Sequence, residues 1–364
     1  MNRVLLACGG TGGHLAPGIA LAQRLTDEGH ECLLIVSSKA VDARMTANYP
    51  RLRFVPGQGR GFGPGFLAKL RFFPALLGAV WSARTLLRAF KPDALVCFGG
   101  FMSVGPALAA RLGGIPVLVH EANRRPGKAV RLIARFAQSI HLPAGVRLAG
   151  LPAGRQHDSG YPVRAEMRPL AKELARRTLG FPSTGRLLLF TGGSQGAASL
   201  NRWVESHLDE LAARGIHALC LTGPGGRDER VERAGVVIHF LPFCHQMATA
   251  YSAADLAVTR AGAGTLAELA TCRTAAILVP FPHAADDHQT ANALQAAESG
   301  AAILLPEREL GRLGEVAFGC LADNAALAAM RDALALADAA NHWEELARET
   351  IELAQARARR VALA

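Results

Sequence analysis

The segment Val4-Leu5-Leu6-Ala7-Cys8-Gly9-Gly10-Thr11-Gly12-Gly13-His14 decides the fold class of this chain. Its apolar half, residues 4–8, is typical of a strand buried on both faces of a parallel sheet. The glycine run, residues 9–13, predicts a turn in which backbone N–H groups approach an anion, and a helix from about Leu15 adds its positive N-terminal end. A turn that only packs the helix on the strand is the alternative. The segment predicts an α/β protein that handles a diphosphate-bearing ligand.

The same pattern recurs about half a chain later, at Phe190-Thr191-Gly192-Gly193-Ser194-Gln195-Gly196. Apolar runs predict strands at 4–8, 32–37, 94–98 and 116–120, and again at 187–191, 218–222, 236–240, 256–259, 276–279 and 302–305. A chain of 364 residues exceeds the size of a single core. We therefore expect two Rossmann-like domains, 1–160 and 161–340, that face a central cleft. The helical tail 341–364 is a candidate for packing back on the first domain.

Composition narrows the class of partner. The formal net charge of +10 suits nucleic acid, an acidic membrane or a phosphorylated substrate. Only three Tyr and three Trp are available for base stacking, so we expect no nucleic-acid partner. Seven cysteines without a Cys-x-x-Cys pair indicate reduced core residues, and the apolar stretch before Cys8 is too short for a secretory signal. These features predict a cytoplasmic protein.

Two nucleotide motifs and a metal site are disfavoured. The dinucleotide fingerprint Gly-x-Gly-x-x-Gly, counted from Gly10, has Leu15 at its last position, and neither glycine turn is followed by Gly-Lys-Ser/Thr. Asp286-Asp287 lies between histidines, which makes a metal the competing interpretation. However, no Asp-x-Asp or metalloprotease spacing occurs, so we expect neither a metal nor a cofactor.

His14 follows the first glycine turn, at the expected mouth of the cleft. An imidazole with a near-neutral pKa suits a general base that takes a proton from an attacking hydroxyl. The alternative is a side chain that only caps or orients the loop. Leaving-group charge would be held by helix N-termini and by cations such as Arg164.

A second candidate phosphate site lies at residues 260–268, Arg-Ala-Gly-Ala-Gly-Thr-Leu-Ala-Glu, after a strand and at the start of a helix. Glu268 suits two ribose hydroxyls, although a glutamate in the first turns also favours the helix dipole. The polar residues of the loop 280–292 suit sugar hydroxyls.

An apolar segment bracketed by Lys and Arg spans residues 66–91. It can rest on an anionic membrane, and a buried helix with snorkelling cations is the alternative. Its uncharged stretch, 72–83, is too short to cross a bilayer.

Six segments, taken in order, resemble the MurG family of peptidoglycan N-acetylglucosaminyltransferases. These are 9–14, Gly99-Gly100-Phe101-Met102-Ser103, His120-Glu121-Ala122-Asn123, 192–196, 260–268 and 280–292. The resemblance implies a two-domain GT-B glycosyltransferase that needs no metal. It implies inverting transfer of N-acetylglucosamine from UDP-N-acetylglucosamine to the muramyl C4 hydroxyl of lipid I, which gives lipid II. It also implies a peripheral position on the anionic inner face of the plasma membrane, with other cell-wall synthesis and division proteins as candidate partners.

The resemblance also implies roles for individual residues. It makes His14 the leading base and Glu121 the acceptor-side acid. It assigns the acceptor to Gly9, Gly10, Thr11, Gly12, Gly13, His14, Gly99, Gly100, Phe101 and Ser103. It assigns the donor to Thr11, Gly12, Gly13, Asn123, Arg164, Ser194, Gln195, Phe243, Cys244, Gly262, Ala263, Gly264, Thr265, Glu268, His288 and Gln289. Within the donor set, Ser194 and Gln195 would meet the diphosphate, Phe243 and Cys244 the uracil, and His288 and Gln289 the sugar.

Four places depart from the family pattern. Phe101 stands where Tyr is common, Tyr161 replaces Asn, Ala261 replaces Ser, and Phe243-Cys244-His245-Gln246-Met247 lacks an acidic pair. A UDP-sugar transferase with another lipid acceptor and a non-catalytic sugar-nucleotide-binding protein remain alternatives.

Overall fold

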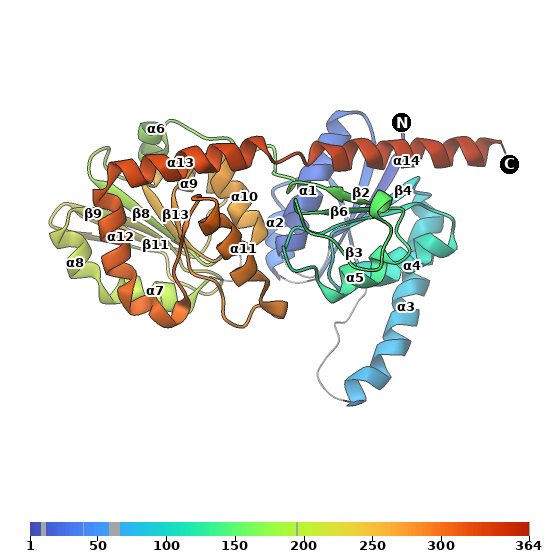
Figure 1. The fold of residues 1–364 in the computed structure, drawn as a ribbon, viewed down its shortest axis with the longest axis horizontal. Helices are drawn as coiled ribbons and strands as arrows, with labels where there is room; N and C mark the ends of the chain where they lie inside the picture. The colour runs from blue at the N-terminus through green and yellow to red at the C-terminus, as the bar shows by residue number, and fades with distance from the viewer. Residues whose placement is uncertain (9–11, 39, 58–65, 194–195, 364) are drawn as a thin grey trace. The chain divides into compact units, whose positions relative to one another are not determined.

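The computed structural model describes residues 1–8, 12–38, 40–57, 66–193 and 196–363. The chain forms two compact units, Met1–Ala165 with His342–Ala364, and Glu166–Asn341. Each unit has its own sheet with helices on both faces (Figure 1). The predicted α/β class with two Rossmann-like domains is confirmed.

The first unit contains a sheet in the order β3-β2-β1-β4-β5-β6-β7, with all neighbours parallel. The strands are β1 Arg3–Ala7, β2 Glu31–Val36, β3 Arg53–Pro56, β4 Ala94–Cys97, β5 Val117–His120, β6 Ser139–Leu142 and β7 Gln156–Asp158. The helices are α1 Gly12–Asp27, α2 Ala40–Thr46, α3 Phe66–Phe90, η1 Phe101–Ser103, α4 Val104–Leu112, α5 Lys128–Ala134, η2 Ala153–Arg155 and α14 Glu344–Ala362.

The second unit contains a sheet in the order β10-β11-β9-β8-β12-β13-β14, in which only β10 runs antiparallel to its neighbour. The strands are β8 Arg186–Thr191, β9 Ile216–Leu221, β10 Glu229–Arg233, β11 Val236–Leu241, β12 Leu256–Thr259, β13 Ala276–Leu278 and β14 Ile303–Leu304. The helices include α6 Lys172–Thr178, α7 Ala198–Ser206, α8 Leu208–Ala213, α9 Met247–Ala253, α10 Ala263–Cys272, η4 Ala285–Asp287, α11 His288–Glu298, η5 Glu307–Arg312, α12 Leu313–Ala322 and α13 Asn324–Ala339.

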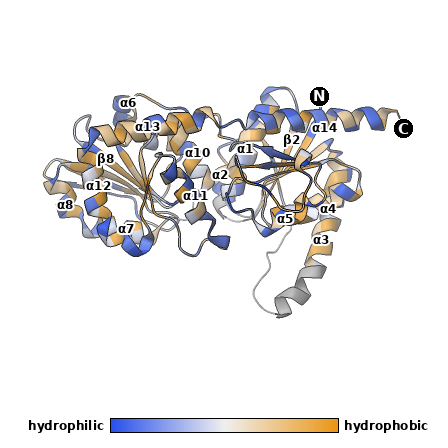
Figure 2. Cartoon of the chain, viewed as in Figure 1, coloured by the Kyte–Doolittle hydropathy of each residue, from blue (hydrophilic) through white to orange (hydrophobic). Residues whose placement is uncertain are grey.

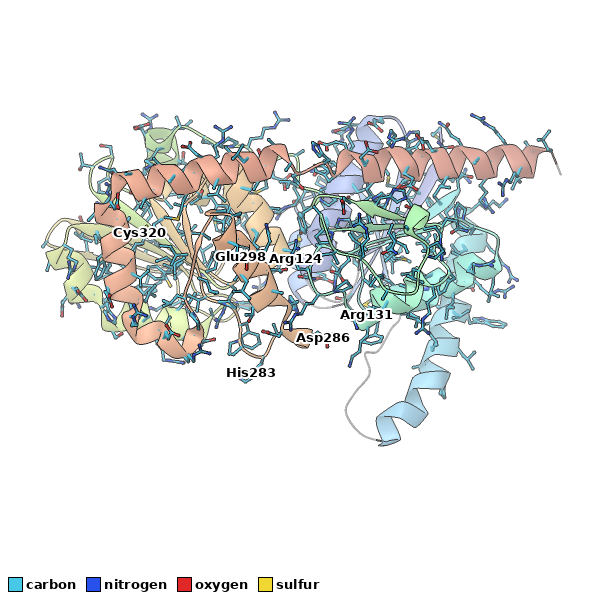
Figure 3. All side chains as sticks on the ribbon, viewed as in Figure 1. Arg124, Arg131, His283, Asp286, Glu298 and Cys320 are labelled. Atoms are coloured by element: carbon cyan, nitrogen blue, oxygen red, sulfur yellow. The ribbon has the colours of Figure 1, made fainter. Side chains whose placement is uncertain are left out.

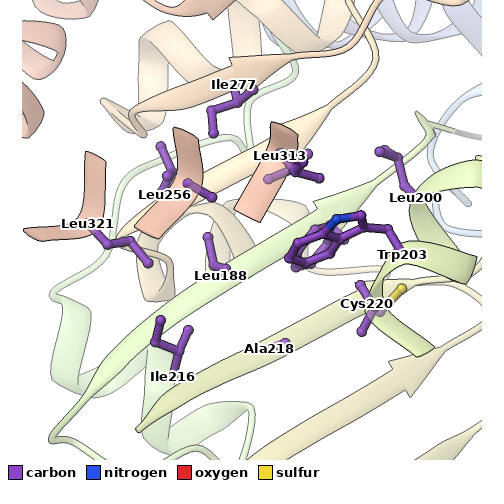
Figure 4. Packing of buried hydrophobic residues seen from close by; sticks show 14 of the residues in the cluster. Leu188, Leu200, Trp203, Ile216, Ala218, Cys220, Leu256, Ile277, Leu313 and Leu321 are labelled. Carbon is purple, nitrogen blue, oxygen red and sulfur yellow. The ribbon is translucent and has the colours of Figure 1, made fainter. Parts of the chain in front are cut away.

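The strands expected from the apolar runs all occur, because helices cover both faces of each sheet and exclude water from consecutive side chains. Figure 2 shows the apolar strands inside each unit and polar residues on the outer helix faces. In the second unit, Trp203 of α7 and Leu313 and Leu321 of α12 pack over Leu188 and Leu256 of the sheet (Figure 4). Each such side chain contributes about 1.5–3 kcal/mol through burial.

The C-terminal helix α14 belongs to the first unit. Leu346, Ala347 and Ala354 join the core beside β1 and β4. Glu349 adds a polar contact, with its Oε2 2.9 Å from Nε2 of the buried His141. The second half of the chain therefore completes the core of the first unit.

Hydropathy gives no single described helix that is long and apolar enough to span a bilayer. One sharply bent pair, Glu307–Ala322 with Asn324–Ala362, meets the length and composition criteria together.

Close contact between α3 and α4 depends on a glycine. A Cβ added to Gly105 would lie 2.8 Å from Cβ and 3.1 Å from the carbonyl carbon of Ala79. We predict that Gly105→Ala lowers the free energy of unfolding by about 1–3 kcal/mol, because the two helices must separate. Gly78→Ala is the matched control, since nothing lies within 4 Å of its added Cβ. Urea unfolding measures both, and equal stabilities would contradict the proposed contact.

Candidate functional site

Each sheet has one point at which the strand order changes direction. In the first unit the chain runs from β1 outward to β3 and then returns to β4 on the other side of β1. In the second unit the equivalent point separates β8 from β12. In open α/β sheets, the loops that diverge at such a point form a ligand-binding crevice at the carboxyl ends of the strands, so these two points are the candidate crevices. The strands that precede the four predicted glycine segments, β1, β4, β8 and β12, end at these two points.

Several predicted site residues lie outside the described part of the chain. They are Gly9, Gly10, Thr11, Ser194 and Gln195. The residues that follow the first of these gaps, Gly12 and Gly13, form the start of α1.

His14 and Gly99 lie together at the first crevice, although 85 positions separate them in the sequence. A Cβ on Gly99 would lie 3.3 Å from Nε2 of His14. Gly99 and Gly100 have φ values of 93° and 71°, which glycine adopts without the steric cost that other residues incur. The close approach of imidazole and backbone therefore requires glycine at position 99.

Ser103 lies beneath this turn and is completely buried. Its hydroxyl lies 2.6 Å from the carbonyl oxygen of Gly99 and 3.1 Å from that of Ala7. Phe101 packs against the core of the first unit. Both side chains therefore contact other parts of the first unit: Ser103 supports the glycine turn and Phe101 packs on the core.

Glu121 organises the loop between β5 and α5. Its Oε1 accepts from the backbone N–H and from Nδ2 of Asn123, each at 2.9 Å, and its Oε2 accepts from the N–H of Gly127 at 2.9 Å. The Glu121 side chain is almost fully buried. These hydrogen bonds hold the side chain of Asn123 in one orientation.

His120, directly before Glu121, is buried at the carboxyl end of β5. Burial lowers its pKa to about 4, although the hydrogen bond that its Nε2 donates to Gly160 O at 2.9 Å partly opposes the shift. At neutral pH His120 is therefore an uncharged hydrogen-bond donor.

The second crevice depends on close backbone packing. A Cβ on Gly192 would lie 2.1 Å from the carbonyl carbon of Gly196, and one on Gly196 would lie 2.5 Å from the carbonyl oxygen of Thr222. Across the crevice, Gly262 is the N-cap of α10 and has no side chain with which to cap its amides. Predicted residues Ala263, Gly264, Thr265 and Glu268 follow in this helix and are partly buried.

The next loop, between β13 and α11, is tied to the one before α10. Gln289 Oε1 accepts from the N–H groups of Phe281 at 2.9 Å and of Ala261 at 3.3 Å. Asn292 Nδ2 donates to Ala261 O at 3.1 Å. Gln289 and Asn292, which the sequence suggested for sugar hydroxyls, therefore use some of their hydrogen bonds to hold the two loops together.

The tip of this loop is strained. Asp286 and Asp287 both have φ of 52°. The side chains of His283 and Asp286 are exposed (Figure 3). His288 begins α11, and its Nδ1 lies 2.7 Å from Ala285 O.

The remaining predicted residues lie on separate elements. Phe243 and Cys244 follow β11, where Cys244 is buried and Phe243 makes an edge contact with His245 at 4.8 Å between ring centroids. Burial raises the pKa of the Cys244 thiol. Arg164 belongs to the first unit, and its Nη1 donates to Tyr49 Oη at 3.2 Å. Within the described ranges, no three His, Cys, Asp or Glu side chains form a possible metal site.

The motifs did not single out Ser199 or Glu307. Both side chains contact Arg260, the residue that follows β12. Nothing in the local sequence links them, because 108 positions separate Ser199 from Glu307.

Comparisons with known proteins agree with this arrangement. Residues 4–142 match the N-terminal domain model of glycosyltransferase family 28, and residues 187–346 match its C-terminal domain model. The chain belongs to glycosyltransferase family 28. Each domain model contains one of the two crevices.

Curated relatives are similar to this protein over nearly its whole length. The UDP-N-acetylglucosamine–N-acetylmuramyl-(pentapeptide) pyrophosphoryl-undecaprenol N-acetylglucosamine transferase of Opitutus terrae is 46% identical, covering 97% of this chain and 95% of the relative. The enzyme of the same name from Gloeothece citriformis is 36% identical, covering 97% of each.

Solved structures give the same fold. Acinetobacter baumannii MurG matches with a TM-score of 0.72 at 26% identity, over 97% of this chain and all of that one. The Streptomyces glycosyltransferase SsfS6 matches with a TM-score of 0.67 at 18% identity, over 97% of this chain and all of that one, and shows the fold alone.

Burial of uncharged His120 makes stability depend on pH. The folded-state pKa lies below the unfolded value, so the native state is favoured above about pH 6.5 and loses this contribution as pH falls toward 4. We predict that His120→Gln reduces the loss of unfolding free energy between pH 7 and pH 4.5. Urea unfolding at both pH values measures it. An unchanged pH dependence in the variant would show that His120 is not the group responsible.

Proposed function

We propose that this glycosyltransferase transfers N-acetylglucosamine from UDP-N-acetylglucosamine to the muramyl C4 hydroxyl of lipid I, giving lipid II. The observation that carries the proposal is the 46% identity over 97% of the chain to the Opitutus terrae enzyme of that name. Closely packed glycines at the point of strand reversal in each unit, Gly99 in the first and Gly192 and Gly196 in the second, support it.

In this proposal the first unit binds the lipid acceptor and the second binds the donor. The acceptor diphosphate meets the segment 9–14 and Gly99-Gly100, while Asn123 contacts both substrates. Gly262 and the first amides of α10 meet the donor diphosphate, assisted by Ser194 and Gln195, and Glu268 accepts hydrogen bonds from the ribose hydroxyls. The remaining donor contacts are Phe243 and Cys244 to the uracil, His288 and Gln289 to the sugar, and Arg164 to the leaving group.

The chemical step uses His14 as the general base. Its imidazole accepts the proton of the C4 hydroxyl while that oxygen attacks the anomeric carbon from the face opposite UDP. The bond from the anomeric carbon to the β-phosphate oxygen breaks, UDP leaves with the electron pair, and the configuration inverts. Glycine at position 99 leaves room beside His14, and amides at the start of α10 stabilise the charge on UDP. The proposed step requires no metal.

A transfer assay tests this function. Purified protein should transfer labelled N-acetylglucosamine from UDP-N-acetylglucosamine to a short-chain lipid I analogue in excess chelator. His14→Ala should lower kcat by about 10²- to 10⁴-fold and leave UDP affinity unchanged, because only the proton acceptor is removed. Glu268→Ala, the matched variant in the other unit, should instead weaken UDP binding measured by calorimetry.

Absence of transfer by the wild-type protein would refute the function. Transfer to a different lipid acceptor alone would favour a related UDP-sugar transferase. Full activity of His14→Ala would remove His14 as the base.

We also propose that this protein is cytoplasmic and that α3 holds it on the anionic inner face of the plasma membrane. Leu77 and Trp81 are 71% and 76% exposed, one turn apart on the helix. Arg84 and Arg88 continue the same stripe at helical spacing and are exposed. An apolar pair beside cations suits the boundary between acyl chains and anionic headgroups. At this surface, other cell-wall synthesis and division proteins are candidate partners.

Substitution of the apolar pair tests the membrane contact. The double variant Leu77→Glu/Trp81→Glu should reduce binding to phosphatidylglycerol vesicles at least about tenfold, because exposed apolar area is lost and negative charge is added. Leu336→Glu is the control, since Leu336 is 74% exposed on α13. Vesicle sedimentation measures binding, and an unchanged double variant would exclude α3 as the contact.

A further inference from the structure

Arg260 lies at the carboxyl end of β12 and is 7% exposed. Its Nη1 donates to the carbonyl oxygens of Val279 at 3.1 Å and Pro280 at 3.3 Å, at the end of β13. Its Nη2 donates to Ser199 Oγ on α7 at 3.2 Å. One guanidinium therefore connects three segments at the ligand-binding edge of the second sheet.

Glu307 fixes this guanidinium from a fourth segment. Its two oxygens pair with the two terminal nitrogens of Arg260, Oε2 with Nη1 at 2.8 Å and Oε1 with Nη2 at 3.0 Å. Ser199 Oγ also donates to Glu307 Oε1, at 2.5 Å. Two parallel hydrogen bonds of this kind set the plane of the guanidinium as well as its position.

The Glu307 carboxylate is stabilised in its charged form. Burial by itself would raise its pKa, but hydrogen bonds from Arg260 and Ser199 outweigh burial and lower the pKa below the ordinary value. The pair therefore stays ionised at neutral pH.

The guanidinium is directed into the protein, and its positive charge is already paired with the carboxylate of Glu307. Its effect on a ligand passes through the backbone that it holds. Arg260 leads directly into Ala261 and Gly262, the residues before α10. Val279 and Pro280 lead into the loop before α11, whose Phe281 N–H donates to Gln289. Movement of Arg260 would shift both loops together.

We infer that Glu307 is a positioning residue for the sugar-nucleotide donor, and that it acts through Arg260 by holding the loops after β12 and β13 in their binding conformation. The inference rests on the proposed function, because it takes these loops to bind the donor. Glu307 and Ser199 would thus affect donor binding without touching the donor.

Removal of the carboxylate tests the inference. Glu307→Ala leaves the buried guanidinium without its partner, so the side chain should turn toward water and release both loops. We predict that KM for UDP-N-acetylglucosamine and Kd for UDP rise about tenfold or more, whereas kcat at saturating donor stays within about twofold. Glu307→Gln should show a smaller rise, because its amide oxygen still accepts one hydrogen bond.

Glu309→Gln is the matched control from the same short helix. Glu309 pairs only with Arg308 at 3.5 Å and Arg312 at 3.4 Å among the salt bridges of the described residues, and both arginines are largely exposed. This variant should keep wild-type kinetics. Thermal unfolding monitors the fold of every variant, and Ser199→Ala with Glu307→Gln decides the outcome if Glu307→Ala does not fold.

The outcomes are distinguishable. Failure of the wild-type protein to bind UDP would count against the proposed function. Wild-type binding together with unchanged donor KM and UDP Kd in the folded Glu307 variants would overturn the positioning role. Lower thermal stability with unchanged donor KM would also overturn it, because the network would then be structural only.

Discussion

Helices cover both faces of each sheet, so a ligand can reach the strands only at their ends, and open α/β sheets bind ligands at the carboxyl edge. The apolar strands exclude polar side chains from their middle, so polar and glycine-rich segments gather where the strands end. The reversal of strand order beside β1 and beside β8 separates two neighbouring loops at that edge. The candidate base, the candidate phosphate turns and the candidate ribose-binding carboxylate all lie at this edge.

Two buried charge clusters lie at the two ends of β12, an interior strand of the second sheet. Before the strand, Asp255 accepts from Arg176 Nη2 at 2.6 Å and from the N–H of Leu187 at 2.8 Å. After the strand, Arg260 pairs with Glu307. Burial of a charge is costly unless its partners replace water. Both clusters meet that requirement, and each joins segments that are distant in sequence. The first secures the fold, while the second lies at the ligand-binding edge.

The sequence predicted the strands that consist of continuous apolar residues, and it missed strands whose stability depends on contacts with distant segments. Buried strands were predicted from continuous apolar runs. Four strands were missed: β3, β6, β7 and β10. They are short or carry charged and polar residues, such as the Glu and Arg of β10 at the sheet edge, where one side stays exposed to water. The buried polar residues of β6 are matched by a distant helix, since His141 contacts Glu349.

The sequence by itself determined the α/β class, the two glycine-rich strand ends, and a resemblance that covers both domains. The strands and turns are set by local effects: apolar side chains favour buried strands, and glycine permits tight turns. Only the tertiary structure decided that His14 lies against Gly99, that Glu121 supports Asn123, and that Glu307 holds Arg260. The physical reason is that His14 and Gly99, like Glu307 and Arg260, are far apart in the sequence and meet only after the strands pair and the crossover helices pack.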